Sequence, residues 1–281
     1  MKTEVELNES TARIAGRIRR LTFEAIATAG SGHYGGSLSI SEILAVLYFG
    51  VMKIDPENPK DPERDMFVLS KGHGGPALYT TLALRGYFPY RDVLDGLDKP
   101  LSKFPKHIDR LKLDGIEAST GPLGQGLSMG CGMAITFLQQ GRKNRVYVLA
   151  SDGECDSGQT WEAVMAAAKY RLGNLVMIVD RNNLQIDGFC DDIMPTDPLD
   201  AKFEAFGWMA RNVDGHDTEE IESAIRDIEK QQESDRRPGV IIAKTVKGKG
   251  VSFMENRAEW HSGKISREQY EQAAAELEEE S

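Results

Sequence analysis

A strand–helix–strand pattern lies between residues 146 and 179, and it limits the folds open to this chain more than any other feature. Two apolar runs rich in Val, Ile and Leu, residues 146–150 and 175–179, have the length of buried strands. The residues between them carry an apolar stripe with helical spacing, which consists of Trp161, Val164, Ala168 and Leu172. Gly173 closes this stripe. Strands joined in this way by a helix lie parallel in one sheet with a right-handed crossover.

Two more apolar runs, residues 66–70 and 240–243, are typical of parallel strands covered on both faces. An amphipathic helix is expected over residues 9–29, and a second helical pattern starts at Ser41. No internal repeat or linker divides the chain. The sequence therefore predicts an α/β protein with a doubly wound, mostly parallel sheet and helices on both faces, in a single domain over residues 1–281.

The C-terminal part, about residues 245–281, is expected to be a loop and one helix. Ser266 and Gln269 have the spacing of a capping box, which predicts a surface helix over residues 270–279. The loop is rich in Lys and Gly, and two interpretations of its lysines stay open: a phosphate-attracting loop, or a mobile solvated one. These lysines are Lys244, Lys247 and Lys249.

Composition limits the classes of partner and compartment. The 34 Lys+Arg and 44 Asp+Glu give a net charge of −10, which disfavours a nucleic-acid backbone as the main partner. Glu4 and Glu6 stand where a signal peptide needs a basic flank, and we expect no membrane-spanning segment. The cysteines are too few and too far apart for a disulfide framework; they are Cys131, Cys155 and Cys190. A reduced, cytoplasmic protein is expected.

Polar residues follow two of the predicted strands. Asp152 and Gly153 come after the run 146–150, and Asn182 comes after the run 175–179, where both face one crevice of a parallel sheet. A carboxylate and an amide oxygen suit Mg²⁺ or Ca²⁺, and Mg²⁺ completes its shell with phosphates and water. Gly153 permits close backbone approach, and the next helix offers N–H groups to an anion. This pattern predicts a metal-bridged diphosphate; the alternative is an ordinary strand–helix turn capped by Asp152.

Four of the five histidines lie in loops or beside glycines: His33, His73, His107 and His261. Four such histidines in one α/β domain are expected to converge on one cleft. Their ordinary pKa near neutrality suits proton transfer. His216 stands between aspartates and is interpreted as a turn residue outside the cleft.

Several blocks, in this order, resemble the N-terminal half of transketolase from about residue 10 to residue 265. They are GSGHYGG, LSKGHGGPALY, STGPLGQGLSMGCGMA, the Asp152–Asn182 motif, IVDRNNLQIDG, NVDGHD, KTVKGKGVSFMEN and WH. The Asp152–Asn182 segment is similar to the thiamine diphosphate motif, normally Gly-Asp-Gly, about thirty residues, then Asn. The resemblance implies the diphosphate-binding domain of the thiamine-diphosphate-binding fold. It also implies transfer of a two-carbon ketol unit from a ketose phosphate to an aldose phosphate, by default pentose phosphates, with thiamine diphosphate and Mg²⁺ or Ca²⁺.

The resemblance also implies residue roles. The metal ligands would be the side chains of Asp152 and Asn182 and the carbonyl of Leu184. The catalytic residues would be His33, His107 and His261. His33 and His261 would assist proton transfers at the sugar hydroxyls, and His107 would contact the donor ketose near its first carbons. The cofactor would be bound by His73, Gly121, Leu123, Gly153, Glu154, Asn182, Ile186 and His261, with Gly153 and Glu154 acting through their backbone N–H groups.

Three positions depart from the family pattern. Ser151 replaces the first glycine of the motif, and Ser157 replaces a carboxylate. The segment around His107, KHIDRLKLDG, lacks the usual Gly-His-Pro context and is one residue longer. Glu162, which in the family lies near the dimer contact, is kept.

In the family, the Glu that activates the cofactor and most substrate-phosphate contacts belong to a second, pyrimidine-binding domain, and no second such module follows here. The resemblance therefore implies the N-terminal subunit of a split transketolase, active only with a separate C-terminal subunit, in an α2β2 assembly. Two alternatives remain: the α subunit of a 2-oxoacid dehydrogenase type of enzyme, and a non-catalytic cofactor-binding or regulatory subunit.

Overall fold

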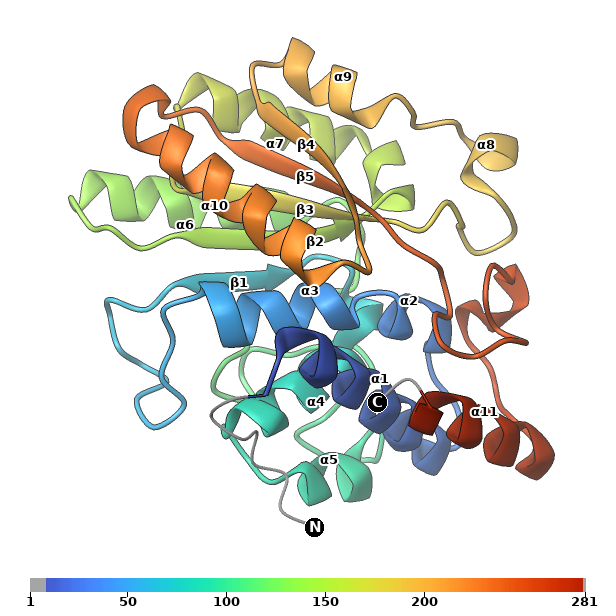
Figure 1. Ribbon diagram of the computed structural model, residues 1–281. Helices are drawn as coiled ribbons and strands as arrows, with labels where there is room; N and C mark the ends of the chain where they lie inside the picture. Colours follow the sequence, from blue (N-terminus) through green and yellow to red (C-terminus); the bar gives the residue numbers. More distant parts are fainter. Residues whose placement is uncertain (1–8, 280–281) are drawn as a thin grey trace.

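The computed structural model of the chain describes residues 9–279, within which five parallel strands form one sheet (Figure 1). The strands are β1 (Met66–Leu69), β2 (Val146–Ser151), β3 (Leu175–Arg181), β4 (Met209–Asp214) and β5 (Gly239–Lys244). Their order is β1-β2-β3-β5-β4, and each neighbouring pair is parallel. The predicted α/β class is confirmed. Glu4 and Glu6, on which the expectation about a signal peptide rests, lie outside the described residues.

β4 is the strand that the sequence analysis did not predict. It lies at the edge of the sheet, and only Met209 and Val213 of its residues are buried. Between them lie Arg211 and Asn212, which face solvent in part or fully. An edge strand of this kind lacks the continuous apolar run that identifies the other four strands.

The two faces of the sheet belong to different apolar cores, because successive side chains of a strand point to opposite sides. In β2, Tyr147 and Leu149 join the first core, whereas Val146 and Val148 join the second. The helices of the first core are α1 (Thr11–Ala29), α2 (Tyr34–Leu38), α3 (Ser41–Val46), α4 (Gly75–Arg85), α5 (Tyr90–Gly96), α10 (Thr218–Asp235) and α11 (Arg267–Glu279). Those of the second are α6 (Gly126–Gln139), α7 (Gly158–Lys169) and α9 (Leu199–Ala205); a short α8 (Cys190–Ile193) precedes α9. Figure 1 shows these helices on the two sides of the sheet.

α1 ends at a turn that leads directly toward the candidate site. Ser10 caps its start by accepting a hydrogen bond from the N–H of Arg13 at 3.4 Å. At its end Gly30 takes a left-handed backbone with φ of +85°, which glycine adopts without steric cost. The chain therefore turns away from α1, and His33 stands immediately before α2.

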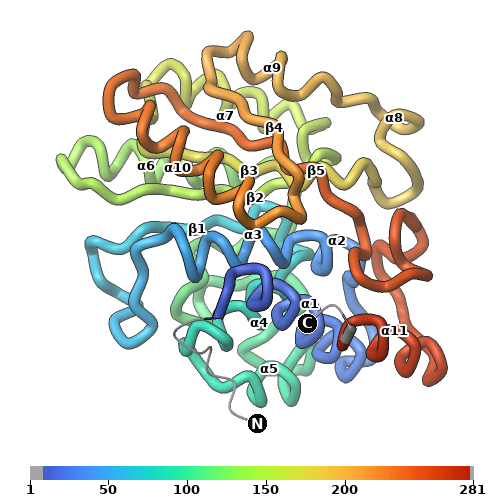
Figure 2. Tube along the Cα trace, viewed as in Figure 1, coloured from blue at the N-terminus to red at the C-terminus, as the bar shows by residue number. Residues whose placement is uncertain are grey.

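α11 begins with the predicted capping box but is more than a surface helix. The N–H of Ser266 donates to Gln269 Oε1 at 2.8 Å, and the N–H of Gln269 donates to Ser266 Oγ at 3.2 Å. Its inner side is buried, with Ala273 at 0% and Leu277 at 1% exposure. The helix lies beside α1 (Figure 2), so the expectation of a simple surface helix is corrected: its apolar residues complete the first core.

One segment among the described residues, Tyr34–Val51, is long and apolar enough to cross a membrane by length and composition alone. The sequence analysis expected no membrane-spanning segment, and a buried core helix also meets this test of length and composition. In the structure 83% of this segment is buried inside the protein. Its apolar character is explained by packing in the first core.

The carboxyl ends of the parallel strands meet at one edge of the sheet, where α/β proteins bind ligands. The segments leaving β1, β2, β3 and β5 there carry the motif residues. In Figure 2 the chain after β5 runs beside α2, and the N–H of Gly248 donates to the carbonyl of Gly35 at 3.1 Å. The C-terminal loop thus lies over this edge and closes one side of the candidate site.

Candidate active site

Four histidines from separate segments form one cluster. The ring centre of His33 lies 5.5 Å from those of His73 and His107 and 5.4 Å from that of His261. His73 and His261 are 5.3 Å apart. The convergence expected from the sequence is thus present, and it includes His107 despite the unusual sequence around it. The Nδ1 atom of His33 is buried and has no hydrogen-bond partner within the described part of the chain.

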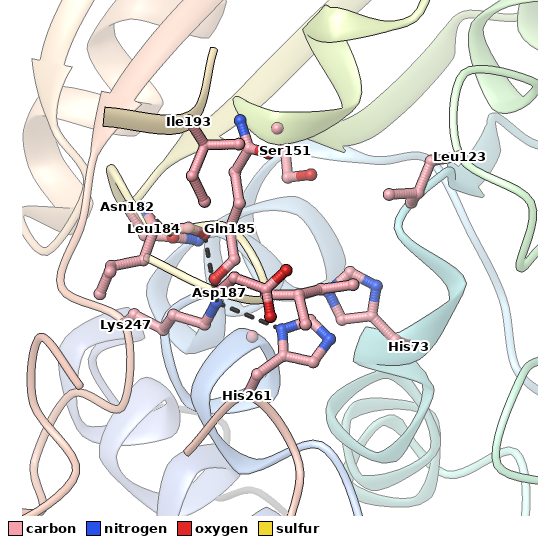
Figure 3. A pocket seen from close by; sticks show the side chains of 13 residues that line it. His73, Leu123, Ser151, Asn182, Leu184, Gln185, Asp187, Ile193, Lys247 and His261 are labelled. Atoms are coloured by element: carbon pink, nitrogen blue, oxygen red, sulfur yellow. Dashed lines mark hydrogen bonds between the residues drawn. The ribbon is translucent and has the colours of Figure 1, made fainter. Parts of the chain in front are cut away.

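A pocket of about 180 Å³ opens beside this cluster (Figure 3). Seven residues of the predicted cofactor and metal set line it: His73, Leu123, Gly153, Asn182, Leu184, Ile186 and His261. Leu123 and Ile186 are exposed, at 40% and 63%, which leaves two apolar side chains at the rim open to solvent. Gly121 lies against the ring of His107, since a Cβ built there would be 3.5 Å from His107 Cδ2. The pocket is therefore open on its apolar side.

The three residues expected to bind a metal lie at the ends of β2 and β3. Asp152 is buried, and its two carboxylate oxygens accept hydrogen bonds from the N–H groups of Gly153 at 2.8 Å and Asn183 at 2.6 Å. Burial, and then the negative charge of Asp180, raises the pKa of Asp152 to about 6. A cation bound there would reverse this effect.

Asn182 is oriented by a residue that the sequence analysis did not single out. Its Nδ2 donates to Asp180 Oδ2 at 2.9 Å, so the amide oxygen Oδ1 is the atom left for a ligand, although it also accepts from the N–H of Leu184 at 3.2 Å. Together with the Asp152 carboxylate and the Leu184 carbonyl, it forms an oxygen-only donor set. Such a set fits Mg²⁺ or Ca²⁺.

Below this set lies a buried ion pair between Lys71 and Asp180, both with fully buried side chains. Asp180 also accepts hydrogen bonds from Ser39 Oγ at 2.8 Å and from Thr245 Oγ1. Burial acts to raise the pKa of Asp180, but the charge of Lys71 and these hydrogen bonds outweigh it and hold the pKa below its ordinary value. The sequence analysis missed this pair because Lys71 and Asp180 are 109 positions apart.

The position of Lys247 argues against a mobile, solvated loop at this residue. Lys247 is 2% exposed, and its Nζ donates to the carbonyls of Leu184 at 3.1 Å and Gln185 at 3.2 Å. Nζ also lies 3.2 Å from Nδ1 of His261 (dashed lines in Figure 3). Burial, and next the nearby charge of Lys71, lowers its pKa to about 8. Lys244, the last residue of β5, is exposed. Among the described residues 244–250, Lys247 is the lysine that lines the pocket.

The protonation of the histidines differs from the sequence-based expectation. Burial is the main cause that lowers the pKa of His33 and of His261 to about 4; the charge of His107 adds to it for His33, and that of Lys247 for His261. Burial, and then Lys71, also holds the pKa of His73 well below its ordinary value. The expectation of pKa values near neutrality is therefore wrong for these three side chains. They are neutral imidazoles at pH 7, able to accept a hydrogen bond or a proton.

Glu154 has a buried side chain that connects the loop after β1, the loop before α6 and the last residue of β2. Its carboxylate accepts hydrogen bonds from Ser70 Oγ, from the N–H of Gly124 at 2.8 Å and from the N–H of Ser151 at 3.4 Å. Ser151 is the last residue of β2, where extended backbone accommodates serine as well as glycine. Ser157 lies against Gly124: a Cβ built on Gly124 would be 2.7 Å from the Cβ of Ser157. The two serines thus fit the loops around the site.

His216 lies outside the histidine cluster. Its Nδ1 is 3.1 Å from Glu42 Oε2, and its Nε2 accepts a hydrogen bond from the N–H of Val246 at 2.9 Å. The expectation that it is not part of the cleft agrees with this position. Its two side-chain hydrogen bonds nevertheless make it more than a turn residue.

Residues 10–278 match the family described as transketolase, thiamine diphosphate binding domain. The chain is 49% identical over 263 residues to the 6-deoxy-6-sulfo-D-fructose transketolase subunit SqwG of Clostridium sp. (strain MSTE9), with 94% of each chain covered. It is 43% identical to a subunit of the apulose-4-phosphate transketolase of Actinobacillus succinogenes, covering 89% of this chain and 88% of that one. Its fold matches transketolase from Leishmania mexicana with a TM-score of 0.88 and 30% identity, covering 96% of this chain but 41% of that chain. The chain thus spans about two-fifths of the length of that solved transketolase.

Proposed function

The chain belongs to the transketolase family, of which it is the thiamine diphosphate-binding N-terminal part, and we propose that it works as one subunit of a two-chain transketolase. In this proposal the complete enzyme transfers a two-carbon ketol unit from a ketose to an aldose. The observation that carries it is the difference in coverage. Relatives named as transketolase subunits are matched over about their whole length, whereas a solved transketolase is matched over 41%.

We propose that the partner is a separate C-terminal subunit that supplies the pyrimidine-binding domain and the Glu that activates the cofactor. The exposed apolar side chains of Leu123 and Ile186 at the pocket rim support this, because a partner seated on them would close the open side. We also propose an α2β2 assembly. Its support is a second set of exposed apolar side chains on α6 and α7, namely Met129, Leu138 and Met165.

We propose Mg²⁺ or Ca²⁺ at Asp152, Asn182 and the Leu184 carbonyl, since this oxygen-only donor set suits a hard cation that also binds phosphate oxygens. The proposed cofactor contacts are the N–H groups of Gly153 and Glu154 and the His73 side chain at the diphosphate. Gly121, Leu123 and Ile186 would hold the rings. The ammonium of Lys247 adds a positive charge to the same pocket.

When bound, thiamine diphosphate supplies the carbon nucleophile for cleavage and formation of the ketose carbon–carbon bond. The chain's own part is to bind the diphosphate, to orient the rings and to handle protons at the sugar hydroxyls. We assign the last task to His33 and His261, and to His107 a contact with the donor ketose near its first carbons. Because His33 and His261 are neutral, they would accept a hydroxyl proton or a hydrogen bond without first losing a proton.

The sugar is proposed from the relatives. Ordinary pentose phosphates are the default donors, but two relatives are named for 6-deoxy-6-sulfo-D-fructose and apulose 4-phosphate. In our proposal most contacts to the substrate phosphate belong to the partner. The whole chain is proposed to be one diphosphate-binding domain that works in the cytoplasm. The one sheet of the described residues supports the single domain, and the three free, buried cysteines support the cytoplasm.

The test is co-purification of this chain with a candidate C-terminal subunit, followed by ketol-transfer assays. Each chain alone and the pair together are given 6-deoxy-6-sulfo-D-fructose, apulose 4-phosphate and xylulose 5-phosphate as donors, with an aldose phosphate acceptor. We expect activity only from the pair. Full activity of this chain alone would overturn the two-chain proposal. A pair that binds thiamine diphosphate and Mg²⁺ yet transfers no ketol unit would favour the non-catalytic alternative.

A further inference from the structure

The segment 244–248 carries Lys247 across the floor of the pocket and is fixed at its far end by glycines. The side chain of Lys247 passes over Gly35, where a Cβ would lie 2.8 Å from Lys247 Cγ. Directly after it, Gly248 has a φ of +79°, and its N–H donates to the carbonyl of Gly35 at 3.1 Å. The position of the Lys247 ammonium therefore depends on where the backbone before it is held.

Two side chains hold that preceding backbone from opposite directions. Thr245 donates its hydroxyl to Asp180, which belongs to the buried ion pair under the metal-ligand set. The N–H of Val246 donates to Nε2 of His216 at 2.9 Å. His216 comes from the turn between β4 and α10, far from the pocket in sequence. His216 thus connects the segment 244–248 to an element that has no residue in the pocket lining.

The hydrogen bonds of His216 define its tautomer. A backbone N–H can only donate, so Nε2 must be the unprotonated, accepting nitrogen of the ring. The ring proton is then on Nδ1, where it is donated to Glu42 Oε2 at 3.1 Å. In the opposite tautomer, with the proton on Nε2, the N–H of Val246 would face a second N–H donor.

Glu42 is itself fixed from α1. Its other carboxylate oxygen binds the guanidinium of Arg19, and both side chains are almost fully buried, at 8% and 5% exposure. Burial acts to raise the pKa of Glu42, but the hydrogen bond from His216 and the charge of Arg19 hold it below its ordinary value. The carboxylate therefore stays ionised and keeps the imidazole of His216 in the accepting tautomer.

We propose that His216 is a positioning residue of the active site: through the backbone of Val246 it holds Lys247 in the pocket, with Glu42 and Arg19 fixing its ring. This inference rests on the proposed function, in which Lys247 is a cation of the diphosphate-binding pocket. His216 touches neither the pocket nor the reacting groups. Its effect on cofactor binding passes through Lys247 alone.

A pair of substitutions separates the two ends of the His216 ring. In His216→Asn the side-chain amide reaches the place of Nδ1, so it keeps the contact to Glu42 and loses the one to Val246. In His216→Gln the amide oxygen reaches the place of Nε2 and can still accept from the N–H of Val246. We expect His216→Asn to expose Lys247 and to weaken cofactor binding. We expect His216→Gln to behave like the wild type in both respects. Equal behaviour of the two variants would overturn the proposal.

The first readout needs no ligand. Acetylation of lysines in the folded, full-length chain is followed by mass spectrometry, with the rates at Lys247 and Lys71 compared. Both are buried now, at 2% and 0% exposure. We expect His216→Asn to speed acetylation of Lys247 at least fivefold while Lys71 stays protected. If both rates rise together, His216 has only a structural role and the proposal is wrong.

The second readout is a double-mutant cycle on binding of thiamine diphosphate with Mg²⁺, measured by calorimetry. His216→Asn should weaken binding about fivefold, as expected for one ordinary hydrogen bond, in the wild-type background. In a Lys247→Met background the same change should have no further effect, because its route to the ligand has been removed. Additive losses in the cycle would overturn the proposal.

The two proposals fail in different ways. A pair of this chain with the partner that never binds thiamine diphosphate, or that transfers no ketol unit, speaks against the proposed function. Selective acetylation of Lys247 in His216→Asn would still support the positioning role in that case. Conversely, an active pair whose His216→Asn variant leaves Lys247 protected retains the function and refutes the positioning role.

Discussion

The ammonium of Lys247 lies 3.1 Å from the carbonyl oxygen of Leu184, the oxygen that we assign to the metal. A carbonyl has two lone pairs, so both partners can share it, but two cations then stand close together. The diphosphate supplies the negative charge that makes this arrangement favourable. Lys247 and the metal are therefore expected to oppose each other without the diphosphate and to act together with it.

Replacing Lys247 by Met should have opposite effects on two ligands. Affinity for thiamine diphosphate with Mg²⁺ should fall about tenfold or more, because a charge-assisted hydrogen bond is worth about 1.5–3 kcal/mol. Affinity for Mg²⁺ alone should rise, because a neighbouring cation has been removed. Calorimetric titrations measure both. Lys244→Met, at the exposed last residue of β5, serves as the control and should change neither affinity.

Metal binding should depend on pH through Asp152. Its pKa is raised to about 6, and the carboxylate must lose its proton before it can bind a cation. Mg²⁺ affinity should therefore fall up to about tenfold for each pH unit below 6 and level off above pH 7. Titrations at pH 5, 6, 7 and 8 measure this dependence. Asp152→Asn should bind Mg²⁺ weakly without this pH dependence; if it retained the same profile, another group would be responsible.

Breaking the buried pair of Lys71 and Asp180 should strongly destabilise the fold. Asp180→Asn leaves the Lys71 ammonium buried without its countercharge, which costs about 3–5 kcal/mol of unfolding free energy. Urea unfolding measures the loss. Adding Lys71→Met to Asp180→Asn should recover part of it, because the uncompensated charge is gone. As a control, Asp95→Asn in the exposed pair with Arg91 should not move the unfolding midpoint.

The neutral histidines should make stability depend on pH in one direction. His33 and His261 have pKa values of about 4 in the folded chain, against an ordinary value of 6.5. Between pH 6.5 and 4 the unfolded chain therefore binds protons that the folded chain does not, and the free energy of unfolding falls as the pH is lowered. Urea unfolding at pH 7, 6 and 5 tests this.

Variants attribute this pH dependence to the cluster. His33→Gln and His261→Gln should each give a shallower fall than the wild type between pH 7 and 5, because glutamine does not titrate. Glu63→Gln, at an exposed carboxylate, is a matched control for general acid effects. Unchanged slopes in both histidine variants would show that other groups cause the loss of stability.

Local patterns were sufficient for four of the five strands among the described residues. The runs at β1, β2, β3 and β5 are continuous and apolar because both of their faces are covered, and the capping box of α11 depends on two residues three positions apart. β4 and the inner side of α11 were missed or misjudged. Their character is set by position at an edge and by contact with the first core, which no local pattern contains.

The histidine cluster and the metal-ligand set were likewise visible in the sequence, since strand–loop order alone brings such residues to one edge of a parallel sheet. The pKa values of the histidines were not. They depend on burial and on cations such as Lys71 and Lys247, which reach the cluster from other segments.

Periodicity and spacing thus suffice for the α/β class and for the residues at the carboxyl edge of the sheet, and the resemblance of the motif blocks indicates the family. Only the tertiary structure decided which lysine enters the pocket and which carboxylate orients Asn182. It also showed how His216 reaches Val246 from the turn before α10. The reason is physical: hydrogen bonds, burial and charge act over a few ångströms in space, between residues that can be more than a hundred positions apart in the chain.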